Sequence, residues 1–221
     1  MKVIAINGSP RKNWNTAQLC EAALKGAADM GAETELIHLE EQAFKGCMSC
    51  YLCHTKKYYD ATSCFYKDRL TPILEKCLEA DVIIIGSPIY YGFVTGDVRA
   101  FMERLMFPLD TYVIDENGKR PVKTTKVTPT AMIYTMNANL QQINYGKGLQ
   151  SNERSLERIF GYSEAYLACD TCQFDDYDLF AANLFNKEHK YEQREKQFPI
   201  DLENCYQMGR RLVEKAIELN A

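Results

Sequence analysis

Four cysteines lie close together in the stretch GCMSCYLCHTKKYYDATSC: Cys47, Cys50, Cys53 and Cys64. They are four of the nine cysteines in a chain of 221 residues. Thiols at such spacing can ligate a metal ion or cluster, can be oxidised to disulfides, or can pack as small apolar side chains. The choice among these chemistries depends on the fold that positions the loop and on the cofactor that the fold holds.

Length and charge limit the class of protein. A chain of 221 residues predicts a single domain over residues 1–221, and a net charge of −4 offers no basic surface for nucleic acid or an anionic membrane. The apolar run near residue 5 is too short for a signal peptide, and no uncharged run is long enough to span a bilayer. We therefore expect a cytoplasmic protein with no nucleic-acid or membrane partner. In that reducing compartment the cysteines favour ligands, redox groups or core residues over structural disulfides.

Patterns typical of strands and helices alternate along the chain. Short apolar runs predict strands at residues 2–7, 34–39, 81–88, 127–136 and 164–170. Apolar residues that recur every three or four positions predict helices at residues 15–30, 68–80, 97–107, 150–161 and from about 201 onward. Asn15 and Gln18 resemble a capping pair for the first helix, and Gly31 ends it. The alternation predicts an α/β fold, a doubly wound parallel sheet of five strands with helices on both faces.

Three segments interrupt this alternation, and we expect them to be embellishments of the domain. The first is the cysteine-rich loop at residues 46–64. The second lies near residues 108–126, where Asn117 and Gly118 between extended flanks predict a β-hairpin. The third lies near residues 173–200 and is charged and aromatic without a clean period. A lid, a subunit contact and ordinary surface are all compatible with that composition.

The loops after the first and third strands are where a doubly wound sheet binds its ligand, at the carboxyl ends of strands beside the switch point. The first loop, GSPRKNWNT, enters the N-terminus of a helix. Backbone N–H groups there, with the hydroxyls of Ser9 and Thr16, suit a phosphate, and Arg11 adds a charged clamp. The alternative interpretation of this loop is a capped turn with polar surface residues.

The first loop excludes several phosphate chemistries. It lacks the Gly-Lys-Ser/Thr ending of a Walker loop and the three glycines of a dinucleotide fingerprint. The preceding strand ends in Asn7, where response regulators need an acidic residue, and the loop has no cysteine to serve as a phosphatase nucleophile. A loop for one phosphate, without nucleophile or acid, indicates a mononucleotide.

The loop after the third strand, GSPIYYGFVTG, suits a flat heterocycle. A tight turn with glycine allows close backbone approach, and apolar or aromatic side chains at residues 88–92 offer faces for a ring. Apolar residues at the end of a strand are equally typical of ordinary core, so this loop taken alone leaves both interpretations open.

Together the two loops resemble the NAD(P)H-dependent FMN reductase branch of the flavodoxin-like superfamily, which includes the iron–sulfur flavoproteins. The family's first motif, G-S-P-R-x-x-x-N-T, is matched by Ser9, Pro10, Arg11, Asn15 and Thr16. The second, S-P-x-Y-x-x-x-x-(S/T)-G before a helix with Phe and Arg, is matched by Ser87, Pro88, Tyr90, Thr95, Gly96, Phe101 and Arg104. The resemblance covers about the first half of the chain. Trp14 departs from it, because the family often carries glycine there, and a bulky ring can shield the phosphate or alter the loop.

The resemblance implies a flavodoxin-like fold and an FMN cofactor. It implies that the first loop binds the FMN phosphate, at Ser9, Arg11, Asn13, Asn15 and Thr16. It implies that the isoalloxazine ring lies against the third-strand loop and the end of the fourth strand, at Pro88, Ile89, Tyr90, Tyr91, Gly92, Thr135, Met136 and Asn137. Neither loop contains a side chain that we nominate as a catalytic acid or base, because the cofactor carries the chemistry.

Within this family, a cysteine-rich segment after the second strand marks the proteins that hold a [4Fe–4S] cluster. Cys47, Cys50 and Cys53 have the spacing of that motif, but Cys64 follows after ten further residues, a longer gap than usual. Zinc is a second interpretation, although structural zinc usually takes two separated pairs of ligands, and reduced thiols are a third.

The remaining cysteines and His54 are interpreted as structural. Cys20, Cys77 and Cys205 lie on apolar helical faces and are predicted to belong to the core. A redox pair is one interpretation of Cys169 and Cys172, but three residues apart on a predicted strand they would point to opposite faces, which favours packing. His54 is predicted to be a surface residue rather than a ligand.

Three functions are compatible with the resemblance. The main hypothesis is an FMN-dependent oxidoreductase that passes electrons from NAD(P)H to a quinone, a nitro compound, a flavin or a protein acceptor. The alternative is an iron–sulfur flavoprotein that carries electrons between protein partners without a small-molecule substrate. The third is a flavin-binding regulatory module without turnover. The resemblance also implies a homodimer or homotetramer.

Overall fold

The computed structural model describes residues 1–124, 126–139 and 146–221. Its strands and helices follow in the order β1 (Lys2–Asn7), α1 (Asn15–Ala28), β2 (Glu33–His38), α2 (Thr71–Glu79), β3 (Val82–Tyr90), β4 (Phe93–Val94), α3 (Gly96–Met106), β5 (Thr130–Thr135), α4 (Gly146–Phe160), β6 (Ser163–Ala168), α5 (Lys187–Glu192) and α6 (Phe198–Leu219). None of the helices in the described ranges combines the length and the hydropathy that a membrane span needs.

Five parallel strands form the sheet, in the order β2-β1-β3-β5-β6. This confirms the predicted doubly wound sheet, whose switch point lies between β1 and β3. β4 is an addition that pairs antiparallel with the end of β3. The two residues between them, Tyr91 and Gly92, have φ of 51° and 89°, as a type I′ turn requires, so the end of β3 folds back as a short hairpin.

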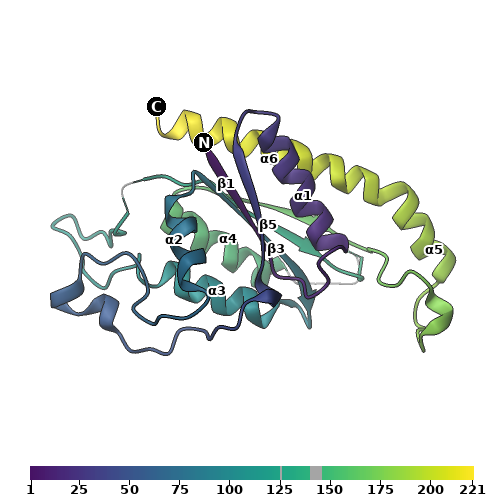
Figure 1. The fold of residues 1–221 in the computed structure, drawn as a ribbon, viewed down its shortest axis with the longest axis horizontal. Coiled ribbons are helices and arrows are strands. Elements are labelled where there is room, and N and C mark those ends of the chain that lie inside the picture. Colours follow the sequence, from purple (N-terminus) through teal and green to yellow (C-terminus); the bar gives the residue numbers. More distant parts are fainter. Residues whose placement is uncertain (125, 140–145) are drawn as a thin grey trace.

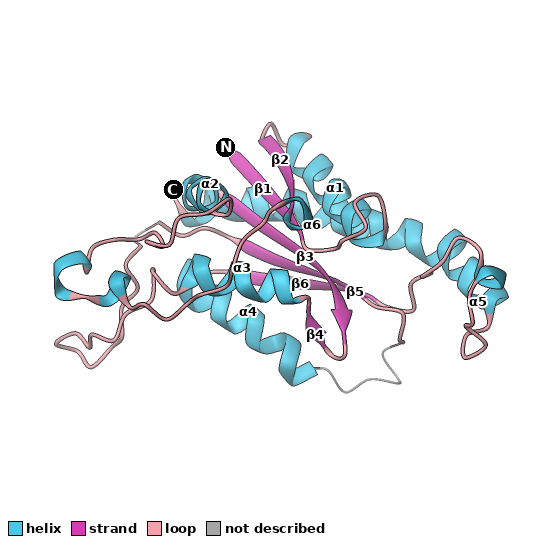
Figure 2. Cartoon of the chain, turned by 60° about the horizontal axis from the view of Figure 1, so that its bottom comes forward, coloured by secondary structure: helices cyan, strands magenta, loops and turns pink. Residues whose placement is uncertain are grey.

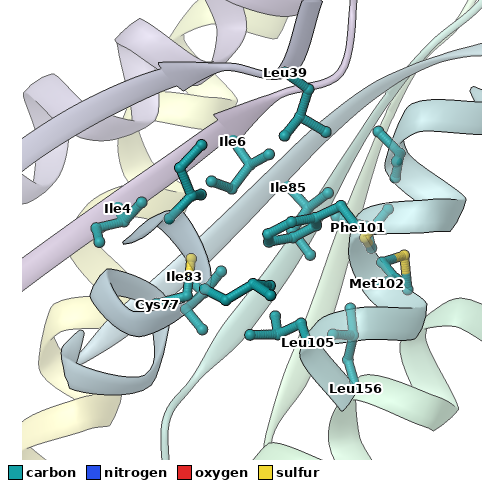
Figure 3. Packing of buried hydrophobic residues seen from close by; sticks show 14 of the residues in the cluster. Ile4, Ile6, Leu39, Cys77, Ile83, Ile85, Phe101, Met102, Leu105 and Leu156 are labelled. Carbon is teal, nitrogen blue, oxygen red and sulfur yellow. The ribbon is translucent and has the colours of Figure 1, made fainter. Parts of the chain in front are cut away.

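Helices cover both faces of the sheet, α1 and α6 on one side and α2, α3 and α4 on the other (Figures 1 and 2). Successive residues of a strand point to opposite faces, and β1 divides accordingly. Val3 packs in the cluster beneath α1 and α6, whereas Ile4 packs with Phe101 and Leu156 on the opposite side (Figure 3). β3 is buried on both faces over most of its length, which explains why its sequence is an unbroken apolar run.

The start of α1 differs from the prediction. Asn15 is the first helical residue rather than the cap, and the cap position is taken by Trp14, whose side chain makes no capping hydrogen bond. The Asn15 amide is used elsewhere: its Nδ2 donates to the Cys172 carbonyl at 2.8 Å. α1 ends at Ala28, and Gly31, with φ of 84°, lies in the turn beyond it.

The prediction of a β-hairpin near residue 117 is wrong, because the turn is present but the two flanking strands are not. Residues 112–122 form no strand; the backbone turns where the Gly118 N–H donates to the Asp115 carbonyl at 3.0 Å. Residues 112–121 are all exposed, so the flanks have no apolar face to bury and no sheet to join.

The segment near residues 173–200 is a loop with one 3₁₀ turn (Tyr177–Leu179) up to residue 186 and is helical from Lys187 onward. α5 continues into one π-helical turn (Gln193–Gln197) and then directly into α6, so the last helix begins well before the predicted Asp201. Figure 1 shows the three as one long rod beside α1. The π turn adds a residue and shifts the helical register, which is why the sequence showed no clean period there.

Candidate functional site

A cavity of about 230 Å³ opens at the carboxyl edge of the sheet. Four loops meet there, those that follow β1, β3, β5 and β6. The lining residues are Ser9, Arg11, Trp14, Asn15, Thr16, Pro88, Ile89, Tyr90, Thr135, Met136, Asn137, Thr171 and Gln173. The structure thus brings together all the residues predicted to bind the cofactor except Asn13, Tyr91 and Gly92.

The loop after β1 is held rigidly against its neighbours. The Ser9 N–H donates to Asn7 Oδ1 at 3.1 Å, and the Arg11 N–H donates to Ser9 Oγ at 3.1 Å. The Gly8 carbonyl accepts from Thr95 Oγ1 at 3.0 Å, and a Cβ on Gly8 would lie 1.9 Å from a methyl carbon of Val98. Glycine is therefore needed for this close approach, and the N-terminus of α1 is fixed as one wall of the cavity.

Trp14 and two arginines surround that helix N-terminus. The Arg11 guanidinium lies 3.9 Å from the centroid of the Trp14 ring, and that of Arg194, from the π turn, lies 5.2 Å from it. Arg194 also donates to Asn15 Oδ1 at 2.7 Å and to Gln18 Oε1 at 3.0 Å. Two fixed positive charges beside unpaired backbone N–H groups make this end of α1 suited to an anion.

Asn13, Tyr91 and Gly92 lie away from the cavity. Asn13 is exposed, and its carbonyl accepts from Gln18 Nε2 at 2.9 Å, while the neighbouring Trp14 ring takes the inward position. Tyr91 is fully exposed at the tip of the hairpin, since the turn directs its side chain outward. Gly92 completes that turn.

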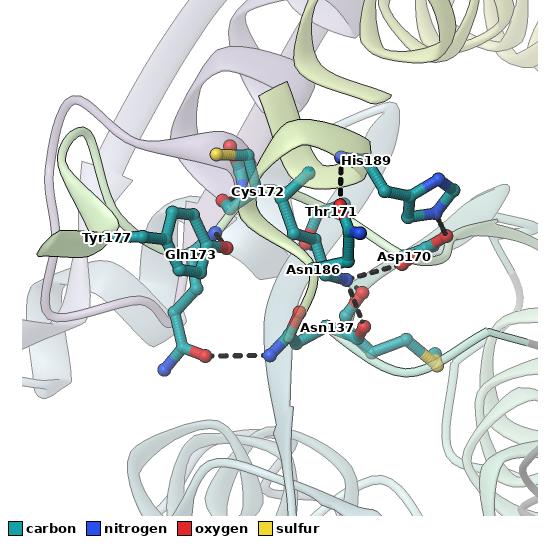
Figure 4. Close-up of polar contacts among 11 residues, drawn as sticks. Asn137, Asp170, Thr171, Cys172, Gln173, Tyr177, Asn186 and His189 are labelled. Atoms are coloured by element: carbon teal, nitrogen blue, oxygen red, sulfur yellow. Dashed lines mark hydrogen bonds and ion pairs between the residues drawn. The ribbon is translucent and has the colours of Figure 1, made fainter. Parts of the chain in front are cut away.

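The loops after β5 and β6 close the cavity through polar contacts (Figure 4). Asn137 Nδ2 donates to Gln173 Oε1 at 2.9 Å, and the Thr171 N–H donates to the Met136 carbonyl at 3.0 Å. Asn137 Oδ1 is buried and has no donor among the described residues, so it is an acceptor available to a ligand. The sequence interpretation missed Thr171 and Gln173, although their place directly after the last strand of a parallel sheet is a signal that could have found them.

A second, larger cavity of about 580 Å³ adjoins the first. Both cavities are lined by Ile89, Met136 and Asn137. On its other side the larger cavity is lined by Asp170, from the loop after β6, and by residues 184–186, 189 and 190 around the start of α5. The two hollows therefore form neighbouring compartments along the edge of the sheet.

The four clustered cysteines line one small cavity, together with Arg104, Phe107 and Tyr66. The long gap before Cys64 does not place it out of reach, because two short 3₁₀ turns, Leu52–His54 and Lys56–Tyr58, take up the intervening residues. Among the described residues no group of three or more His, Cys, Asp or Glu side chains is set close enough to hold a metal ion. The thiols thus face a common space without forming a ligand geometry.

Backbone strain and a buried arginine shape this cysteine segment. Ser49 and Tyr51, on either side of Cys50, have φ of 53° and 55°, in the left-handed region that side chains other than glycine seldom adopt. The fully buried Arg104 donates to the carbonyl before the segment, at Lys45 (3.1 Å), and to the one after it, at Tyr66 (2.6 Å). It therefore clamps both ends of the loop.

His54 does not line the cysteine cavity. Its ring stacks on Phe107 with centroids 4.4 Å apart and meets the edge of Tyr112 at 4.9 Å. Lys123 Nζ donates to the carbonyl of the neighbouring Cys53 at 2.6 Å. Burial raises the pKa of the Cys53 thiol, and the Lys123 charge offsets part of that increase.

The other cysteines are largely buried. Cys20, Cys77 and Cys205 belong to the core as predicted, and burial raises the pKa of the first two to about 12. The prediction that Cys169 and Cys172 share a strand is wrong, because β6 ends at Ala168. Both lie in the loop beyond it, where Cys172 is buried and its Sγ donates to the Phe174 carbonyl at 3.1 Å.

A sequence profile of the family described as NADPH-dependent FMN reductase matches residues 1–142. The chain belongs to this family. The match covers the loops after β1 and β3 and the end of β5, which supply eleven of the residues around the smaller cavity.

Curated relatives of this family member include iron–sulfur flavoproteins. One from Archaeoglobus fulgidus is 41% identical over 126 residues, 57% of this chain and 59% of the relative. One from Methanocaldococcus jannaschii is 40% identical over 104 residues, 47% of this chain and 51% of the relative. The chain therefore spans about half the length of the curated relatives that it matches.

Solved structures confirm the flavodoxin-like fold of this family member. An azoreductase from Bacillus anthracis superposes with a TM-score of 0.64 at 13% identity, over 96% of this chain and 99% of that one. An NAD(P)H:quinone oxidoreductase from Methanothermobacter marburgensis superposes with a TM-score of 0.62 at 13% identity, over 96% of each chain. At such low identity the likeness concerns the fold alone.

Proposed function

We propose that the protein is an FMN-dependent oxidoreductase, which passes electrons from NAD(P)H to a quinone, a nitro compound, a flavin or a protein acceptor. The observation that carries this proposal is the convergence of the phosphate-type loop and the heterocycle-type loop on one cavity at the switch point of the sheet. Family membership supports it, because the matched region contains both loops.

The residues around the smaller cavity fit FMN in chemistry and order. Ser9, Arg11, Asn15 and Thr16 would hold the phosphate at the start of α1, with Trp14 covering it. The isoalloxazine ring would lie against Pro88, Ile89 and Tyr90 and along Thr135 to Asn137, where Asn137 Oδ1 lacks a donor. In this arrangement Asn13 would make no contact with the cofactor, while Tyr91 and Gly92 would act by turning the hairpin.

When bound, FMN supplies the two-electron chemistry, and the chain supplies positioning. Backbone N–H groups of the hairpin loop and the rigid α1 loop would orient the ring, and the apolar side chains beside it would exclude water. Two arginines near the phosphate would keep the cofactor anchored while its ring faces the larger cavity.

Ligand binding and anaerobic reduction test this proposal. Purified protein should bind FMN much more tightly than riboflavin, because the loop after β1 is built for a phosphate. The flavin absorbance of the FMN complex should then bleach on anaerobic addition of NADH or NADPH, and the more effective donor identifies the nicotinamide. Equal affinity for FMN and riboflavin, or no bleaching by either donor, would contradict the proposal.

A second candidate function is an iron–sulfur electron carrier, and the observation that favours it is the common cavity of the four cysteines. Four thiols that face one space form the donor set of a [4Fe–4S] cluster, in which Cys47, Cys50, Cys53 and Cys64 would each ligate one iron. Glu103 and Arg104, near the C-terminal end of α3, line the cysteine cavity, whereas Thr95 at the N-cap of α3 donates to the Gly8 carbonyl in the loop beside the smaller cavity. Anaerobic purification followed by iron and sulfide assay distinguishes this candidate from zinc and from free thiols.

We also propose a cytoplasmic homodimer or homotetramer. Tyr90, Tyr91 and Phe93 at the hairpin are all more than half exposed beside the smaller cavity, which is unusual for aromatic side chains of a monomer. Sedimentation equilibrium of the native protein and of a Phe93→Ser variant tests the contribution of this hairpin.

A further inference from the structure

The larger cavity carries a cluster of three charged or titratable side chains on the wall opposite the proposed flavin site. They are Asp170, from the loop after β6, and His189 and Lys190 from α5. Figure 4 shows Asp170 beside His189. The other wall, formed by Ile89, Met136 and Asn137, is shared with the smaller cavity. A ligand in the larger cavity would therefore lie beside a flavin in the smaller one and would face this cluster.

Two hydrogen bonds fix the position of His189, one from its backbone N–H and one at its imidazole ring. Its N–H donates to Asn186 Oδ1 at 2.7 Å, which caps α5, and its Nε2 lies 2.6 Å from Asp170 Oδ2. Its Nδ1 has no partner among the described residues, and the side chain is 48% exposed. The Asp170 carboxylate thus orients Nε2, while Nδ1 is open to a ligand or to water. This arrangement suits a general acid, which gives a proton to a ligand and then takes another from water.

Asp170 is fixed as an anion. Burial alone would raise the pKa of its carboxyl, but the hydrogen bonds from Lys190 and His189 hold that pKa below its ordinary value. Lys190 is itself buried and also donates to the Asn137 carbonyl at 2.7 Å, which ties the cluster to the end of β5. The Asp170 backbone has φ of 56°, a left-handed conformation that turns its side chain back toward α5.

The remaining surface of the larger cavity suits a flat, weakly polar molecule. Ile89, Met136, Ala138, Leu184 and Phe185 are apolar, and Asn137, Asn139 and Asn186 are the neutral polar groups. The volume of about 580 Å³ is ample for a one- or two-ring compound and lies within the usual range for small-molecule sites. No cluster of basic side chains lines the described wall, as an anionic acceptor would require; Lys190 is already paired with Asp170.

We propose that the larger cavity binds a quinone as electron acceptor and that His189 donates a proton to the reduced quinone, an inference that rests on the flavin reductase function proposed above. Reduction of a quinone to a hydroquinone takes two electrons and two protons. Both electrons and one of the protons would be supplied as a hydride by the flavin chemistry of the proposed reductase. The second proton leaves His189 Nδ1: the N–H bond breaks, an O–H bond forms on the quinone oxygen, and the neutral imidazole takes a proton from water.

Comparison of two acceptors tests this role. FMN holoprotein is reduced with dithionite in the absence of oxygen and mixed with duroquinone, whose methylated ring does not add thiols, or with ferricyanide, which accepts an electron without a proton. His189→Gln, which can still hydrogen-bond Asp170 but cannot serve as an acid, should slow flavin reoxidation by duroquinone about 100-fold. Reoxidation by ferricyanide should stay unchanged, and the matched control Glu188→Gln, exposed on the same helix, should change neither rate.

Each outcome of these experiments decides between the proposals. If duroquinone oxidises the native protein and the His189→Gln variant equally fast, or if ferricyanide slows in parallel, His189 is not the proton donor. If duroquinone fails to oxidise the native protein, the cavity does not take quinones. If NAD(P)H fails to reduce the flavin while the dithionite-reduced protein still shows the His189 effect, the reductase function fails and the acid role stands.

Discussion

Thr16 Oγ1 lies 2.8 Å from Thr135 Oγ1, and this buried pair joins the first turn of α1 to the last residue of β5. The two residues are far apart in the chain and line the smaller cavity from different loops. One of the two hydroxyls donates to the other, so each residue fixes the position of its partner. The contact therefore couples the part of the cavity suited to a phosphate to the part suited to a ring.

Substitution of Thr16 by Val should both destabilise the fold and loosen the cavity. Val has nearly the shape of Thr but no hydroxyl, so Thr135 Oγ1 would be left buried without its partner at a cost of about 1–3 kcal/mol. Urea unfolding of the apoprotein measures this cost. Thr16→Ser keeps the hydroxyl and serves as the control, and a Thr16→Val variant as stable as the Ser variant would show that the pair contributes nothing.

Arg194 should contribute to FMN affinity although it comes from the C-terminal helices. Its guanidinium lies beside the N-terminus of α1 and bonds Asn15, so Arg194→Met should weaken FMN binding about tenfold, or roughly 1.4 kcal/mol. Riboflavin lacks the phosphate and should bind the variant as it binds the native protein. Lys196→Met, on the same π turn but exposed and paired with Glu192, is the matched control. Equal losses for FMN and riboflavin would assign Arg194 a purely structural role.

The contrast between Ser9 and Arg194 explains how much of the site the sequence could predict. Ser9 belongs to a local motif between a strand and a helix, and the position of that loop follows from the rules of parallel sheets. Arg194 reaches the same helix end only because α6 packs along α1 and the π turn continues from α6 past the start of α1. No local pattern marks such a contact, and the register shift of the π turn conceals even the helix that makes it.

Asn13 and Trp14 show that side-chain packing within a single loop is also hard to predict from a local sequence pattern. The resemblance placed Asn13 among the phosphate-binding residues, although Trp14 beside it departs from the family. The structure gives the inward position to Trp14, whose large ring stacks on Arg11. The sheet order was predictable from alternating periods, whereas this choice depends on the packing of side chains from the loop itself and from the π turn.

Arg104 should be essential for the cysteine segment to fold. It is fully buried and bonds Asp68 Oδ2 at 2.5 Å, as well as carbonyls on both sides of the segment. Arg104→Met leaves the Asp68 carboxylate poorly compensated, and breaking such a pair costs about 3–5 kcal/mol. Thermal unfolding should show a large loss for this variant and almost none for Arg99→Met, an exposed arginine on the same helix. Similar losses for the two variants would refute the clamp.

The same pair predicts how stability depends on pH. Burial alone would raise the pKa of Asp68, but the hydrogen bonds from Arg104 and from two backbone N–H groups lower it below the ordinary value. A depressed carboxyl pKa stabilises the fold above the unfolded-state value of about 4, and that stability is lost as pH falls through the folded-state value. Between about pH 6 and pH 3 the native protein should therefore lose more stability than Asp68→Asn, which has no carboxyl to titrate. Parallel pH profiles in urea unfolding would contradict this.

Cys64 provides the sharpest test of the cysteine cavity, because it is the residue whose distance in sequence makes cluster binding least obvious. Protein purified without oxygen should contain about four irons per chain if the common cavity holds a cluster. Cys64→Ser should lose most of that iron and the broad charge-transfer absorbance, while Cys169→Ser, a half-buried cysteine in the loop after β6, should keep both. If the native protein and Cys169→Ser contain no iron but one tightly bound zinc, which Cys64→Ser loses, the zinc interpretation is correct. If the native protein contains no metal, the four thiols are free and the electron-carrier candidate is excluded.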